Sequence, residues 1–382
     1  MYSCDVLIAG GGPAGSSCAW GLRSSGLHVL ILDKSVFPRD KVCGGWVTPL
    51  VLQELEIDPA SYTRGRTFQA ITGFRVSCMG EREVNVAYDR IVSYGIRRCE
   101  FDEYLLRRSG AQIREGVPIG RVERSGDSWI INGEIKTSLL VGAGGHFCPV
   151  ARSLGNTNGA EPVVAQEVEF AMDAQQAASC TIAPEVPELY FCRDLQGYGW
   201  CFRKGNFLNI GLGRLDQHAL PDHVSRFLEF LRAAGKLAFD PGKRLAGHAY
   251  LLFGHSQRKL MEDSVMLIGD SAGLAYAQSG EGIRPAVESG LLAAEAIKLA
   301  DGKYTRDRLE RYPKLLADRF SRGGNRAETL ARHLPRSLRN RVARRLLSQE
   351  WFCRRVVVDN WFLHAHDPTL LAASPSPVPA LR

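Results

Sequence analysis

The segment Asp5-Val6-Leu7-Ile8-Ala9-Gly10-Gly11-Gly12-Pro13-Ala14-Gly15 decides the fold of the N-terminal region. Its apolar beginning predicts a buried strand, and the small residues that follow it predict a helix. Gly10 permits a tight turn, Gly12 lets the backbone approach a pyrophosphate, and Gly15 lets helix and strand pack closely. The helix is expected from Ser16 to about Ser25, and its free N-terminus, with Pro13 and Ala14 in the turn before it, would hold the phosphates of a dinucleotide.

A second strand is predicted at residues 28–32, and it ends at Asp33. In dinucleotide-binding folds, an acidic residue about twenty positions after the glycines accepts hydrogen bonds from the ribose. Such a carboxylate binds both ribose hydroxyls and repels a 2′-phosphate, which favours FAD or NAD over NADP. We therefore expect Asp33, with Lys34 beside it, in the nucleotide site.

A second nucleotide signature lies far along the chain, where the predicted strand 264–268 ends in Gly269-Asp270. A carboxylate at the end of a strand can accept hydrogen bonds from a polyol, and a helix N-terminus favours a developing anion. Flavin carries both a ribityl polyol and an N1–C2=O locus that becomes anionic on reduction, so this pattern favours FAD. The residues expected on this side of the cofactor are Gly269, Asp270, Gly280, Gly282 and Ile283.

The composition of the 382 residues is that of a globular protein, with 45% hydrophobic and 23% charged residues. It excludes a peptide hormone, a disulfide-stapled miniprotein and a disordered chain. The net charge of +7 suits anionic partners but is too small to indicate nucleic acid binding. The sequence has no basic signal-peptide start, no apolar run of spanning length, and no C-x-x-C pair among its ten cysteines. We expect a cytoplasmic protein with reduced thiols and no metal site.

Four local motifs resemble those of the glutathione-reductase-type FAD-dependent oxidoreductases, the group that includes flavin monooxygenases and halogenases. They are the two nucleotide signatures, the segment Pro38–Gly45, and Tyr198-Gly199-Trp200 with Gly211-Leu212-Gly213. The segment Pro38–Gly45 favours the geranylgeranyl reductase family within this group. The resemblance implies an α/β fold in which a Rossmann-like FAD-binding domain carries an inserted antiparallel sheet for an apolar or carrier-bound substrate.

The resemblance also assigns a cofactor role to Arg98, which would contact the pyrophosphate or ribityl group of FAD. The alternative is a surface charge at the start of a helix. One motif departs from the family, because Gly144 stands where the family usually has an aspartate that is associated with FAD and pyridine-nucleotide contacts. The electron donor therefore stays open among NAD(P)H, ferredoxin and a flavin reductase. We expect slow reduction by NADPH alone and faster reduction with an acidic redox partner protein.

Flavin carries out the redox step itself, so the protein has to position the substrate and charged groups around it. The residues that we expect to take part are Cys43, Lys41 and Trp200. The resemblance places Cys43 near the flavin with Lys41 close by, and an inert buried thiol is the alternative. Trp200 would face the isoalloxazine ring or form part of the pocket wall.

Three functions follow from these observations. The favoured one is an FAD-dependent oxidoreductase that reduces carbon–carbon double bonds of an apolar substrate. The first alternative is a monooxygenase or halogenase of a secondary-metabolite pathway, although residues 198–203 lack the Trp-x-Trp-x-Ile-Pro segment of halogenases. The second alternative is a non-catalytic FAD-binding accessory protein.

The expected FAD-binding domain is discontinuous and comprises residues 1–75, 96–160 and 258–300. Residues 76–95 and 161–257 would form the substrate-binding domain. Strand alternation at 163–172, 188–192, 199–202 and 207–213, with turn residues between, predicts an antiparallel sheet there. Residues 301–382 would form a helical C-terminal region that ends in a disordered, proline-rich tail at 374–379. The many arginines of this region indicate either a solvated face, or attraction to an anionic substrate or to a membrane that the protein contacts peripherally.

Overall fold

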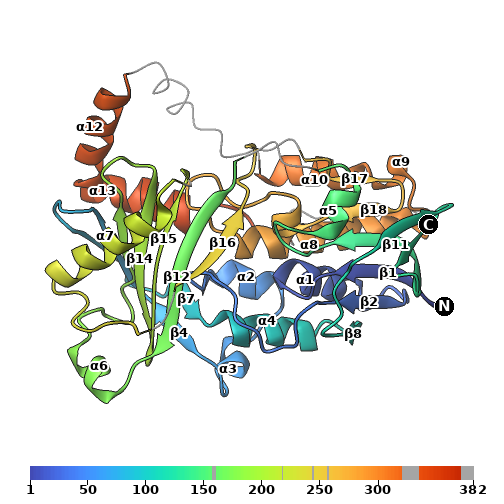
Figure 1. Cartoon of the computed structure of the whole chain (residues 1–382), viewed down its shortest axis with the longest axis horizontal. Helices are drawn as coiled ribbons and strands as arrows, with labels where there is room; N and C mark the ends of the chain where they lie inside the picture. Colours follow the sequence, from blue (N-terminus) through green and yellow to red (C-terminus); the bar gives the residue numbers. More distant parts are fainter. Residues whose placement is uncertain (157–160, 217, 243–244, 256–257, 321–334, 371–382) are drawn as a thin grey trace, which may run out of the picture.

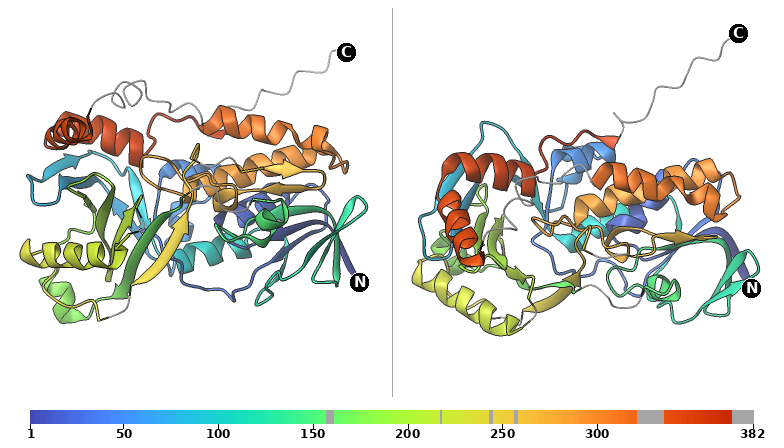
Figure 2. Two further views of the ribbon diagram at one scale, coloured as in Figure 1. Left: turned by 45° about the horizontal axis from the view of Figure 1, so that its top comes forward. Right: turned by 90° about the horizontal axis from the view of Figure 1, so that it is seen from above.

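The computed structural model describes residues 1–156, 161–216, 218–242, 245–255, 258–320 and 335–370 (Figure 1). The proline-rich tail at 374–379 lies outside the described residues. In the described part of the chain, the strands form sheets of eight, seven and three strands. Figure 2 shows that the first sheet, with its covering helices, occupies the end of the molecule where the N-terminus lies, and that the second sheet occupies the other end.

The first sheet has the order β17-β18-β11-β1-β2-β8, and the four pairings from β18 to β8 are parallel. The central strands are buried on both faces, which explains their continuous apolar sequence. The strands are β1 (Tyr2–Ala9), β2 (Val29–Leu32), β8 (Gln112–Arg114), β11 (Ile135–Gly142), β17 (Met261–Glu262) and β18 (Val265–Leu267), with the hairpin β9 (Val122–Ser125) and β10 (Ser128–Ile131) attached to β11.

Two helices with small residues pack closely on this sheet, α1 (Pro13–Leu22) and α8 (Ile283–Ala300). A Cβ added at Gly290 would lie 2.4 Å from the carbonyl oxygen of Ala14, so the glycine is required for the contact. Gly21 meets Ala294 in the same way. The first and second nucleotide signatures therefore belong to one packed unit, although more than half of the chain separates them.

The second sheet has the order β16-β12-β15-β14-β13-β5-β6, and all of these pairings except β13 with β5 are antiparallel. Helix α7 (Leu220–Ala233) covers one face with buried residues at helical spacing. The small third sheet, β3-β7-β4, lies in the region of Figure 1 where the two larger sheets meet. The strands are β5 (Gly73–Cys78), β6 (Val84–Ala87), β12 (Val163–Ala171), β13 (Glu188–Phe191), β14 (Gly197–Lys204), β15 (Phe207–Arg214), β16 (Ala246–Tyr250), β3 (Trp46–Val47), β4 (Phe68–Ile71) and β7 (Ser93–Ile96).

This architecture confirms the expected fold class of a Rossmann-like domain with an antiparallel sheet and C-terminal helices. The residue limits assigned to the separate domains stay a prediction. Among the described residues, no helix combines the length and the apolar character that crossing a bilayer requires. The remaining helices include α2 (Pro49–Glu54), α3 (Pro59–Tyr62), α4 (Arg98–Arg107), α5 (Pro149–Ser153), α6 (Ala174–Ser179), α9 (Arg306–Leu309), α10 (Arg311–Phe320), α12 (Arg336–Leu347), α13 (Glu350–Phe352) and a π-helix at Cys353–Phe362.

Candidate functional site

The glycines of the first turn have different structural roles. Gly10 has φ +123° and its added Cβ would lie 2.4 Å from the Ala143 carbonyl oxygen, while a Cβ at Gly15 would lie 1.9 Å from the Gly10 carbonyl oxygen. These two glycines are needed by the fold itself. At Gly12, the nearest atom to an added Cβ is Arg39 Nη2, 3.4 Å away. The absence of a side chain at Gly12 therefore leaves space at the start of α1, whose N-terminus has no side-chain cap.

Arg39 supplies positive charge beside this space, and the sequence analysis did not select it. Its Nη1 is buried and has no hydrogen-bond partner in the described part of the chain. Its Nη2 lies 3.2 Å from Asp102 Oδ2, and Arg98 donates two hydrogen bonds of 2.8 Å to the same carboxylate. An unpartnered guanidinium N–H next to an uncapped helix N-terminus fits the negative charge of a pyrophosphate.

The Arg98 side chain is buried, so Arg98 is not a surface charge. It lies in the first turn of α4 and donates hydrogen bonds to Asp102 of the same helix. Asp33 directly follows β2 as expected, and its carboxylate accepts hydrogen bonds from the backbone N–H groups of Gly11 (2.7 Å) and Ser35 (2.8 Å). Each oxygen keeps a second lone pair for a ribose hydroxyl. Lys34 is exposed, directly beyond the end of the strand.

The second signature meets the first in space. Gly269 has φ +60°, and its added Cβ would lie 2.8 Å from Ala14 Cβ. Asp270 follows in a 3-10 turn, and its Oδ1 would be 3.3 Å from a Cβ added at Gly282, the residue that caps α8. A carboxylate, two tight glycines and two helix N-termini are thus brought together. Ile283 is the buried first residue of α8, and Gly280 has φ +67° and packs against the Tyr250 hydroxyl.

Asp270, His248 and Lys41 form a chain of polar contacts between the two sheets. His248 Nε2 lies 3.5 Å from Asp270 Oδ2, and Lys41 Nζ lies 3.0 Å from the His248 ring nitrogens. Burial lowers the pKa of Lys41 to about 8, although the Asp270 charge opposes the shift. Burial would raise the pKa of Asp270, but the hydrogen bond from His248 and the charges of Lys41 and Arg98 hold it below its usual value. The Asp270 side chain stays ionised and 21% exposed.

Cys43 lies above a buried polar network of the second sheet. Asn209 Nδ2 donates to the Cys43 carbonyl oxygen (3.2 Å), and Trp200 Nε1 donates to Asn209 Oδ1 (2.7 Å). Burial raises the pKa of the Cys43 thiol despite the nearby Arg98 guanidinium. The thiol is therefore protonated at neutral pH, which makes it a poor nucleophile. Trp200 is itself buried on β14, so its indole N–H serves the network.

Two acidic residues of β12 complete the network, and the sequence analysis missed both. Glu169 pairs with buried Lys204 at 2.7 Å, whereas Glu167 lies 3.5 Å from the Asn209 amide. Burial raises the pKa of Glu167 to about 7. Because Glu167 and Glu169 are two residues apart on one strand face, their spacing was a detectable signal. His248 and Arg39 gave no comparable signal.

The raised pKa of Glu167 predicts a pH-dependent gain in stability for Glu167→Gln. Between pH 4.5, the ordinary pKa, and about pH 7, the folded chain retains a proton that the unfolded chain releases. Wild-type stability therefore falls as the pH rises through this range. The free energy of unfolding of Glu167→Gln minus that of wild type should therefore be greater at pH 8 than at pH 5, by up to roughly 3 kcal/mol. Chemical denaturation at the two pH values measures this difference.

The exposed Glu229→Gln in α7 provides the matched control, since it should show no such pH difference. An equal shift in both variants would contradict a proton held on Glu167.

Comparison with known proteins now identifies the family. Residues 8–62 match the family described as an NAD(P)-binding Rossmann-like domain. Menaquinone reductase of Mycobacterium tuberculosis is 31% identical over 355 residues, which cover 86% of this chain and 83% of that protein. Digeranylgeranylglycerophospholipid reductase of Methanocaldococcus jannaschii is 27% identical, with 81% of each chain covered. The chain belongs to the geranylgeranyl reductase family. As a member of the geranylgeranyl reductase family, it is an FAD-dependent oxidoreductase.

Solved structures agree with this assignment at the level of the fold. A geranylgeranyl bacteriochlorophyll reductase-like protein from Thermoplasma acidophilum superposes with a TM-score of 0.72 at 23% identity, covering 91% of this chain and 88% of that one. The flavin-dependent halogenase CmlS gives a TM-score of 0.65 at 19% identity, covering 84% and 63%. At these identities the likeness shows a shared scaffold, so the halogenase similarity does not distinguish the reaction.

Proposed function

We propose that this geranylgeranyl reductase family member uses FAD to reduce carbon–carbon double bonds in a polyprenyl-bearing apolar substrate. The observation that carries the proposal is the extended identity to menaquinone reductase and to digeranylgeranylglycerophospholipid reductase. The substrates in both names carry polyprenyl chains, although their head groups differ. We therefore expect this family member to bind a substrate that carries a polyprenyl chain.

We propose that FAD lies across the N-termini of α1 and α8, with its pyrophosphate at Gly12. The open space at Gly12 and the unpartnered Nη1 of Arg39 support this placement. Asp33 would bind the ribose and Asp270 the ribityl hydroxyls, since both are acceptors beyond the carboxyl ends of parallel strands of the same sheet. The other residues that we expect in the site are Gly10, Pro13, Ala14, Gly15, Lys34, Arg98, Gly269, Gly280, Gly282 and Ile283.

When bound and reduced, FAD supplies a hydride from N5 to one carbon of the double bond, and the other carbon requires a proton. The chain has groups that can hold a proton near neutral pH on the side of the second sheet, at Cys43 Sγ, Lys41 Nζ and the Glu167 carboxyl. We propose that Lys41 and Cys43 supply or relay this proton. Trp200 would form the apolar wall, where it packs with Tyr198.

The test is an anaerobic single-turnover reaction. The FAD-loaded chain is reduced chemically and mixed with menaquinone or geranylgeranyl diphosphate, and the product is analysed by mass spectrometry. We expect a gain of two hydrogens for each double bond reduced, with free reduced FAD as the control that gives none. A parallel reaction is mixed with labelled dioxygen, and incorporation of the label into the substrate would instead establish a monooxygenase. Unchanged substrates under both conditions would overturn the proposal and favour an accessory protein.

We further propose that a redox partner protein, such as ferredoxin or a flavin reductase, delivers the electrons. This proposal is supported by Gly144, which offers no carboxylate to a nicotinamide nucleotide, and by the net charge of +7, which suits an acidic partner. The same anaerobic apparatus tests it, because bleaching of the flavin absorbance can be followed with each donor. Rapid and complete bleaching by NADPH or NADH without any partner would show that the proposal is wrong.

A further inference from the structure

Helix α12 presents apolar side chains to solvent in the middle of a basic face. Leu338 and Val342 are one helical turn apart and are 43% and 46% exposed. Arg341 and Arg345 are exposed beside them. Trp351, in the following helix α13, is 56% exposed. These are three of the nine large apolar side chains that are exposed in the described part of the chain, and they lie within fourteen residues of one another.

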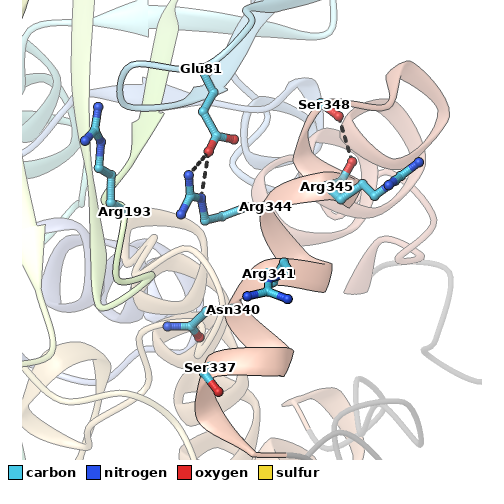
Figure 3. Close-up of a pocket in the computed structure, with 8 residues that line it drawn as sticks. All are labelled: Glu81, Arg193, Ser337, Asn340, Arg341, Arg344, Arg345 and Ser348. Atoms are coloured by element: carbon cyan, nitrogen blue, oxygen red, sulfur yellow. Dashed lines mark hydrogen bonds and ion pairs between the residues drawn. The ribbon is translucent and has the colours of Figure 1, made fainter.

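A basic surface cavity of about 580 Å³ adjoins this face. Figure 3 shows Glu81 reaching Arg344 of α12, with Arg193 on a neighbouring segment and Arg341 and Arg345 also along α12. Arg344 is neutralised by an ion pair with Glu81. In the described residues, no carboxylate pairs with Arg341 or Arg345. The cavity is lined by four arginines and one glutamate, a formal excess of three positive charges, together with Ser337, Asn340 and Ser348.

The opposite face of α12 holds the helix on the body of the protein. Leu347 is buried in the core beneath the second sheet, and Asn340 Nδ2 donates to the Asp194 carbonyl oxygen at 3.3 Å. These inward-facing residues hold α12 in place, so the folding of the helix does not require its exposed apolar side chains. Figure 1 shows α12 at the end of the molecule opposite the N-terminus.

We propose that the outer face of α12 and α13 docks peripherally on a bilayer of anionic phospholipid. Arg341 and Arg345 would bind lipid phosphates, while Leu338, Val342 and Trp351 enter the boundary between head groups and acyl chains. Aliphatic residues and a tryptophan interleaved with arginines have the composition of an interfacial helix. An acidic protein surface would satisfy the arginines but would leave the exposed aliphatic side chains unexplained. The inference does not depend on the reaction proposed above.

The test is co-sedimentation of the full FAD-loaded chain with lipid vesicles. We expect binding to vesicles of equal phosphatidylcholine and phosphatidylglycerol, weakening with salt, and little binding to phosphatidylcholine alone. Arg341→Gln with Arg345→Gln should lower the partition coefficient roughly 25-fold, at about fivefold for each arginine near the surface. Leu338→Ser with Val342→Ser should lower it about tenfold without changing the charge.

The matched control is Arg64→Gln with Arg308→Gln, which removes the same charge from exposed positions elsewhere in the chain. It should bind vesicles as wild type does, and every variant should retain its flavin absorbance and unfolding temperature. An equal loss of binding in the control, or no binding of wild type at low salt, would overturn the proposal. So would stabilisation by inorganic phosphate through Arg341 and Arg345 without any vesicle binding, because the cavity would then serve a soluble anion.

Discussion

Gly12→Val should give a folded chain that purifies without FAD. The nearest atom to a Cβ at this position is the flexible end of Arg39, 3.4 Å away, so the protein itself has room for the new side chain. The added methyl groups would instead occupy the space where we place the pyrophosphate. Backbone approach and helix N–H contacts to the phosphates would be lost together. The measurement is the ratio of flavin absorbance to protein absorbance after reconstitution with excess FAD.

Two other substitutions make this result interpretable. Gly120→Val introduces the same side chain outside the nucleotide turn, at a position where the nearest atom is 3.9 Å away, and it should retain the flavin. Gly15→Val should prevent folding, because its Cβ would collide with the Gly10 carbonyl oxygen. A yellow Gly12→Val protein with wild-type flavin content would remove the pyrophosphate from this turn.

Asp270→Ala should weaken FAD binding by about tenfold to a hundredfold. The carboxylate is ionised and partly exposed at the end of β18, so it can accept charge-assisted hydrogen bonds that contribute roughly 1.5–3 kcal/mol. Its removal also takes away the negative charge that raises the pKa of Lys41. The Lys41 pKa should then fall further below about 8. Fluorescence titration of the apoprotein with FAD measures the dissociation constant.

Asp270→Asn is the conservative companion, because it keeps a neutral acceptor and should recover part of the affinity. The exposed Asp89→Ala removes the same charge from the surface and should leave the dissociation constant unchanged. An unaltered dissociation constant in Asp270→Ala would place the ribityl chain elsewhere.

The features that the sequence predicted correctly depend on local chain geometry. The glycine turn after β1, the aspartate at the end of β2 and the Gly-Asp turn after β18 each follow from residues that are neighbours in sequence. The antiparallel sheet also followed from alternation and turn residues along its strands. The family could be identified from the sequence because its motifs are also made of residues that are neighbours in the chain.

The parts of the site that were missed depend on contacts between distant segments. His248 reaches Asp270 and Lys41 only because β16 pairs with β12 at the edge of the second sheet. Arg39 can be assigned to the site only from its proximity to Gly12 and Asp102, and neither residue lies next to it in the chain. Arg98 was named by resemblance, but its burial beside Asp102 could be established only by the packing of α4.

The close packing of α1 against α8 has a consequence for biosynthesis. A ribosome releases the first nucleotide turn early, whereas β18, Asp270 and α8 emerge only after the whole second sheet has been made. Domains generally fold in the order of synthesis, but this nucleotide unit cannot close until residue 300 has left the exit tunnel. Nascent chains that stop before α8 should therefore be colourless, and the cofactor should be captured as one of the last events in the maturation of the protein.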